Sequence, residues 1–175
     1  MIRPPRSRLE ADLLAAHLAA AGVAAHVLEA TLPGLGPWFK PGLANLFTLV
    51  AFFHLGWRTA VAVALIRVVA GSLTVGTFLS PTFFLSLSGA LGAVAAMGVG
   101  GLLPLGLGPV GLSLLAALAH MSAQVVAAFF LILGHQGLFL ALPWFLAGSW
   151  VTGIVNGVLA FLILERLAPN QASPP

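Results

Sequence analysis

The sequence predicts an all-α fold, in which six transmembrane helices form a polytopic membrane bundle. Of the 175 residues, 60% are hydrophobic and only 6% are charged, whereas an average soluble domain carries about 25% charged residues. The mean hydropathy of +1.09 points the same way. With so few charges the chain cannot cover a water-exposed surface, so a soluble globular protein and a disordered protein are both excluded.

Six apolar stretches fit the roughly 20 residues that a membrane-spanning helix needs. They are residues 11–32, 42–55, 59–79, 82–103, 110–134 and 138–164. Turn-forming breaks rich in glycine, proline or polar residues separate them, at residues 33–37, 56–58, 80–81, 104–109 and 135–137. The second stretch has only about 14 residues, so we expect it to be tilted, partly re-entrant or sheltered by its neighbours.

The chain is expected to form one domain. Residues 1–10 are a basic cytoplasmic segment, residues 11–166 the six-helix transmembrane domain, and residues 167–175 a flexible cytoplasmic tail. The first stretch is not expected to be a cleaved signal peptide, because Glu10, Asp12 and His17 interrupt its apolar core and no polar mature domain follows.

The distribution of cations predicts the orientation. Six spans place both termini on one side, together with Arg3, Arg6, Arg8, Arg58 and Arg166, whereas Lys40 stands alone on the other. The positive-inside rule then makes the termini cytoplasmic. Trp38 and Trp57 fall at opposite ends of the second span, as interfacial anchors. The sequence pI near 11.3 reflects seven cations in a nearly uncharged chain, so no nucleic-acid partner is expected.

Several chemistries are absent from the sequence. Without cysteine there are no disulfides or thiolate ligands, and the five histidines show no metal-binding spacing. No P-loop or G-x-S-x-G motif occurs, and the G-x-G-x-x-G at residues 106–111 lacks the preceding strand and the following acidic residue of a dinucleotide site. We therefore expect no metal, no cofactor and no enzymatic activity.

Arg67 is the most informative residue. It lies eight residues into the third span, about 12 Å deep, where a cation costs at least roughly 2.5–3.5 kcal/mol. It therefore needs an anionic partner, a wet cavity or a polar ligand. Gly71 and Thr74 follow on the same helical face, which leaves room for a cavity or a tightly packed helix.

Further polar residues interrupt other spans. Glu29 lies near the outer end of the first span, Asn45 near the outer start of the second, and His120 and Gln124 share one face of the fifth. We predict that these four and Arg67 form a substrate-binding site for a small-molecule solute, in a cavity open toward the outside. The alternative is that Arg67 pairs with Glu29, while His120, Gln124 and Asn156 only connect neighbouring helices.

Small residues recur at helical spacing. Gly153 and Gly157 form a GxxxG motif that favours helix packing. On the first span, Ala11, Ala15 and Ala19 form one row of small residues, and Ala16, Ala20 and Ala24 form another. Such rows indicate either internal packing or a surface on which another membrane subunit docks.

A series of short motifs resembles one bacterial membrane family, heptaprenyl diphosphate synthase component I, also called the Gx transporter family. The motifs are residues 40–45 (KPGLAN), 65–72 (LIRVVAGS), 76–80 (GTFLS), 85–89 (LSLSG) and 119–124 (AHMSAQ). That family is similar to the substrate-binding S components of energy-coupling factor (ECF) transporters. The resemblance implies an S-component-like bundle, and partners that are a transmembrane T component and cytoplasmic ATPases. It also implies docking through small residues of the first helix, for which we predict Ala15 and Ala19.

Three functions remain open. The first is a solute-binding subunit of an ECF-type uptake transporter. The second is an accessory membrane subunit of isoprenoid or quinone biosynthesis, and the third an assembly subunit of a membrane complex. A catalytic prenyl diphosphate synthase is excluded, because such enzymes hold Mg²⁺-diphosphate through clustered aspartates and this chain has one, Asp12.

Overall fold

The computed structural model describes residues 7–31, 42–104 and 106–167, and all regular secondary structure in these ranges is helical. The α-helices are α1 (Arg8–Thr31), α2 (Leu43–Leu55), α3 (Trp57–Val75), α4 (Pro81–Leu102), α5 (Pro109–Ala128) and α6 (Leu142–Leu167). A π-helix, η1 (Phe129–Leu133), extends α5, and a 3₁₀-helix, η2 (Gln136–Ala141), leads into α6. The predicted all-α fold is confirmed for this part of the chain.

Most helix ends lie near the predicted breaks, but α3 ends at Val75, before the predicted end of its span at residue 79. Gly56 separates α2 from α3 with a φ of 92°, a conformation that favours glycine. Ser80 caps α4, because its Oγ accepts a hydrogen bond of 3.4 Å from the backbone N–H of Phe83, and Pro81 occupies the first turn. The break between α5 and α6 centres on Gly134, whose φ is 59°.

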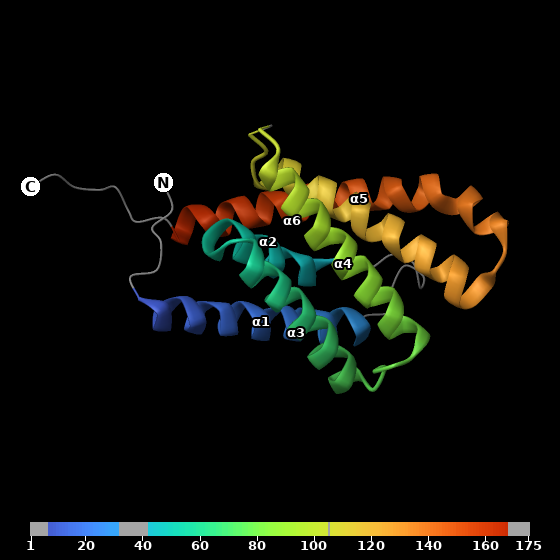
Figure 1. Ribbon diagram of the computed structural model, residues 1–175, viewed down its shortest axis with the longest axis horizontal. Helices are drawn as coiled ribbons and strands as arrows, with labels where there is room; N and C mark the ends of the chain where they lie inside the picture. Colours follow the sequence, from blue (N-terminus) through green and yellow to red (C-terminus); the bar gives the residue numbers. More distant parts are fainter. Residues whose placement is uncertain (1–6, 32–41, 105, 168–175) are drawn as a thin grey trace, which may run out of the picture.

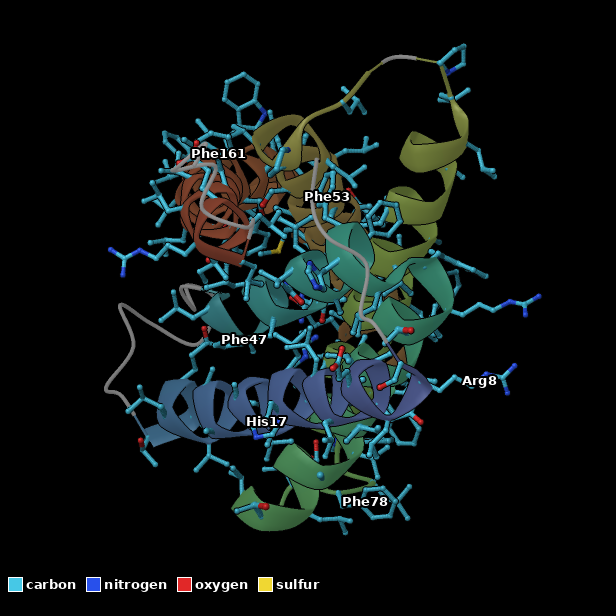
Figure 2. The ribbon with its side chains drawn as sticks, turned by 90° about the vertical axis from the view of Figure 1, so that its left-hand side faces the viewer. Arg8, His17, Phe47, Phe53, Phe78 and Phe161 are labelled. Carbon is cyan, nitrogen blue, oxygen red and sulfur yellow. The ribbon has the colours of Figure 1, made fainter. Side chains whose placement is uncertain are left out.

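Five of the helical segments are long and apolar enough to cross a membrane, counted over the ranges given above, and the chain is a multi-pass membrane protein. The exception, α2, has 13 residues and a length of about 20 Å, against a hydrocarbon core of about 30 Å. It is sheltered rather than lipid-exposed, since Leu49, Val50 and Ala51 are at most 1% exposed. It contacts α1, α3 and α6, and Figure 2 shows it between α1 and α6.

The described chain begins and ends at the same end of the bundle. The start of α1, the α2–α3 connection and the end of α6 all lie toward the left of Figure 1. Arg8, Arg58 and Arg166 are therefore at one end, as the sequence predicts, and all three are exposed. Arg3, Arg6, Trp38 and Lys40 lie outside the described residues.

Trp57 lies at this same end, as the first residue of α3. About half of it is exposed, and its indole Nε1–H donates a hydrogen bond of 2.9 Å to the carbonyl oxygen of Val94. An apolar ring with a satisfied N–H at a helix end is typical of an interfacial anchor.

Small residues bring the later helices into backbone contact. A Cβ added at Gly157 would lie 2.6 Å from the Cα of Val110, and one added at Gly153 would lie 3.0 Å from the Cα of Leu114. The GxxxG motif therefore packs α6 directly against α5, as expected.

The two alanine rows of α1 face different surroundings. Ala19 is 5% exposed within the apolar core, and Ala15 is half-buried, so this row packs inside the protein. The burial of Ala19 leaves this row little surface on which a partner could dock, and docking through Ala15 and Ala19 stays a prediction. The rotation of α1 instead exposes Ala16, Ala20 and Ala24.

Candidate functional site

A cavity of about 180 Å³ lies among the helices, and all six α-helices contribute to its walls. Its polar lining is His26, Glu29, Asn45, Arg67, Thr82, Ser86, Ser113, His120, Gln124, Ser149, Thr152 and Asn156. Because one ordered water needs roughly 10–15 Å³ by this kind of measure, the space is about twelve times that minimum. The cavity is large enough for a small organic molecule.

All five residues predicted to form the site line this one cavity: Glu29, Asn45, Arg67, His120 and Gln124. They come from four helices, α1, α2, α3 and α5, and are up to 95 positions apart in sequence (124 − 29). The arrangement follows from the bilayer, because a polar side chain in a span avoids lipid only by facing the interior of the bundle.

Arg67 projects from α3 and is 4% exposed. Its aliphatic part crosses α1 at Gly22, where an added Cβ would lie 3.4 Å from Cδ. Its Nε has no hydrogen-bond partner among the described residues. The guanidinium is therefore buried, charged and incompletely hydrogen-bonded, which is costly unless another group approaches it.

The expected space beside Arg67 is largely filled by α1. An added Cβ at Gly71 would lie 2.6 Å from the His26 ring, so this glycine admits a histidine rather than an open cavity. Thr74, one turn further along, is exposed on the outside of the bundle. The face therefore packs tightly against α1 at Gly71, while Arg67 itself lines the cavity.

Glu29 is buried in the last turn of α1. Its Oε1 accepts a hydrogen bond from the backbone N–H of Leu43, the first residue of α2. A carboxylate at this point satisfies an N–H that the helix leaves unpaired and interacts favourably with the helix dipole. Glu29 also attracts Arg67 electrostatically, so it serves α2 and the charge balance of the cavity together.

Gly42 precedes α2 and connects it to α6. Its φ of 68° is in the left-handed region, which favours glycine, and its carbonyl oxygen accepts a hydrogen bond of 3.0 Å from Nδ2 of Asn156. Asn156 thus connects two helices, as the sequence suggests, and also lines the cavity.

His120 is held between α2 and α4. Its Nδ1 lies 3.4 Å from Nδ2 of Asn45, and because an amide nitrogen only donates, Nδ1 accepts and the ring proton is on Nε2. Nε2 faces Gly89. A Cβ added at Gly89 would lie 2.6 Å from this Nε2 and 2.9 Å from Cγ of Gln124. The absence of a side chain at Gly89 therefore makes room for His120 and Gln124.

An apolar layer lies beneath these polar groups. We call Asn45, Arg67, His120 and Gln124 the polar layer, and Leu49, Met97 and Ala116 the apolar floor. Leu49 lies one turn after Asn45 on α2 and Ala116 one turn before His120 on α5, both toward the end of the bundle that carries Arg8. All three floor residues line the cavity and are at most 3% exposed. The polar layer is thus closed from that end by carbon.

Sequence reasoning missed part of the lining. Ser149, Thr152 and Asn156 lie on α6 at the spacing i, i+3, i+7, and Thr82 and Ser86 on α4 at i, i+4. These spacings place each set on one helical face, a signal that was available. Helical spacing could not show that His26 lines the cavity, because its position depends on how closely α1 approaches Gly71 of α3.

The residues that the structure describes form no group of three or more His, Cys, Asp or Glu side chains arranged to hold a metal ion. The cavity offers amides, hydroxyls, imidazoles, one guanidinium and one carboxylate, which are groups that orient an organic solute through hydrogen bonds.

Comparison with known proteins identifies the family. No curated protein and no solved structure matches the chain. The sequence model of the family described as heptaprenyl diphosphate synthase component I matches residues 18–163, a range that contains the whole predicted site. The chain therefore belongs to the heptaprenyl diphosphate synthase component I family.

Proposed function

We propose that this protein is an integral membrane subunit that binds a small organic solute, resembling the S component of an ECF-type uptake transporter. One observation carries the proposal: four helices direct Glu29, Asn45, Arg67, His120 and Gln124 into one cavity of about 180 Å³. Residues that only connected helices would leave little space between them. A polar cavity around a buried cation supports solute binding instead.

The chain needs a partner to concentrate a solute. It carries no P-loop, so energy would come from a transmembrane T component and its cytoplasmic ATPases. The exposed row of Ala16, Ala20 and Ala24 offers a face on which another helix can pack closely. The family description, which names one component of a system, is consistent with a partner subunit.

The proposed orientation is in a bacterial inner membrane with both termini in the cytoplasm. Exposed Arg8, Arg58 and Arg166 at one end of the bundle support it through the positive-inside rule. The cavity residues near the opposite end, such as Glu29 and Thr82, would then face the outside.

We further propose that the chain has no catalytic activity of its own. Prenyl transfer on a Mg²⁺-diphosphate requires several carboxylates, and the sequence has a single aspartate, Asp12, in the first turns of α1. The cavity includes one carboxylate, that of Glu29.

The test is native mass spectrometry of the full chain purified in mild detergent, with and without Arg67→Gln. A small molecule that co-purifies with the wild-type protein and is lost from Arg67→Gln supports solute binding. Arg58→Gln is the matched control, because it removes the same charge from an exposed position on the same helix. A wild-type protein that carries no solute, and that no candidate solute stabilises against heat, contradicts the proposal.

The family description favours a second candidate, an accessory membrane subunit of isoprenoid or quinone biosynthesis. In that case a separate catalytic subunit would perform prenyl transfer and depend on this chain. Prenyl-transfer assays on membranes with and without the chain separate the two candidates. An unchanged rate excludes the accessory role, and a rate that falls without the chain supports it.

A further inference from the structure

We infer that the cavity selects a solute with one anionic oxygen group, a carboxylate or a phosphate, and that this group binds Arg67. The inference rests on the proposed solute-binding function and names the class of solute. It starts from the buried guanidinium of Arg67, whose Nε has no hydrogen-bond partner among the described residues.

The charged side chains on the cavity wall differ in how fully they are hydrogen-bonded within the protein. Among the residues that the structure describes, two charged side chains line the cavity, Glu29 and Arg67. Glu29 already accepts a hydrogen bond from the N–H of Leu43, at the positive end of α2. Arg67 is permanently protonated, so its remaining donors and its charge are the groups that a solute would meet.

His120 does not supply a second cation. Because Nδ1 accepts from Asn45, the ring carries its one proton on Nε2, which faces Gly89. The polar layer therefore offers one positive charge among neutral groups. An anionic oxygen would accept charge-assisted hydrogen bonds from the guanidinium, whereas a cation would be repelled by it and a neutral solute would form only weaker hydrogen bonds with it.

The rest of the wall suits the remainder of such a solute. The Asn45 and Gln124 amides can bond to its polar substituents, and the apolar floor of Leu49, Met97 and Ala116 can contact its carbon skeleton. The floor also makes that side of the cavity apolar. An ion pair strengthens as the surrounding dielectric falls, so the floor favours the anion further.

Thermal unfolding of the full chain in detergent tests the inference with matched compounds. The anions are benzoate, nicotinate and phenyl phosphate, the neutral counterparts benzamide and nicotinamide, and the cation benzylammonium. We expect at least one anion to raise the Tm with the logarithm of its concentration, while its amide counterpart does not. Arg67→Gln should abolish that shift, and Arg58→Gln, at an exposed position on the same helix, should keep it.

Comparison of the Tm shift produced by phenyl phosphate with that produced by benzoate distinguishes a phosphate site from a carboxylate site. An amide or benzylammonium that shifts the Tm as much as benzoate, or an anion shift that survives Arg67→Gln, overturns the anionic class while solute binding stands. No shift with any of these compounds, together with no co-purifying solute, overturns both the inference and the proposed function.

Discussion

Glu29 of α1 accepts a hydrogen bond from the backbone N–H of Leu43, the first residue of α2. The carboxylate that the sequence offered as a partner for Arg67 is thereby held at a helix N-terminus. Arg67 still feels its attraction, but Glu29 has a structural role that would persist without the arginine. This separates the fold-stabilising part of the cavity from the part available to a solute.

A double-mutant cycle between Glu29 and Arg67 should therefore show weak coupling. Glu29→Gln keeps an acceptor for the Leu43 N–H but loses its charge, and should lower the free energy of unfolding by about 1 kcal/mol. Arg67→Gln should leave the Tm of the ligand-free protein close to that of the wild type. Their coupling energy should stay below about 1 kcal/mol, whereas breaking a buried ion pair costs about 3–5 kcal/mol.

The measurement is unfolding in detergent, with Glu165→Gln, an exposed glutamate of α6, as the control. Strong coupling, combined with no stabilisation of the wild type by any solute, would mean that Arg67 and Glu29 form an internal ion pair and nothing more.

Gly89→Ala should damage the cavity from α4. Its Cβ would lie 2.6 Å from Nε2 of His120 and 2.9 Å from Cγ of Gln124, so both side chains must shift. We expect a loss of about 1–3 kcal/mol in stability, the usual cost of overpacking, together with loss of solute-dependent stabilisation. Gly108→Ala is the control, because its φ is −74° and an added Cβ there meets nothing within 4 Å. A Gly89→Ala protein that is stabilised by solute like the wild type would show that His120 and Gln124 are dispensable.

The two alanine rows of α1 should respond differently to leucine. Replacing exposed Ala16 and Ala20 should leave the Tm and solute binding unchanged, while capture of the T component and ATPases by the tagged protein falls. Replacing Ala19, at 5% exposure, should instead lower stability by about 1–3 kcal/mol through overpacking. Partner capture that withstands Ala16→Leu together with Ala20→Leu would rule out this face as the docking surface.

Reporter fusions test the orientation. Green fluorescent protein fused to the C-terminus should fluoresce, because it folds in the cytoplasm beside Arg166. Alkaline phosphatase inserted at Thr77, in the α3–α4 connection at the opposite end of the bundle, should be active outside. An active phosphatase at the C-terminus would reverse the proposed orientation.

Much of the fold could be predicted because each segment that crosses the bilayer must be apolar along its own length, so local hydropathy identifies it. A segment of about 20 apolar residues must form a helix to satisfy its backbone, so the six stretches and their breaks at residues 56–58, 80–81 and 135–137 can be predicted from the sequence. The same constraint predicts that Arg67 and His120 face the interior, since lipid would penalise them. For the short α2, its length allowed a tilted, a partly re-entrant or a sheltered helix, and the structure shows the sheltered one.

The sequence by itself determined the membrane class, the number and approximate extent of the apolar stretches, and the five polar residues that meet at one cavity. Only the tertiary structure decided what those residues touch: Glu29 at the start of α2, His26 against Gly71, and His120 against Gly89. It also decided that Ala19 faces the core while Ala16 faces outward. Burial in a helix is set by composition, but contacts between helices depend on how each one is rotated and how closely it crosses its neighbours. Those quantities arise from packing among residues far apart in the chain.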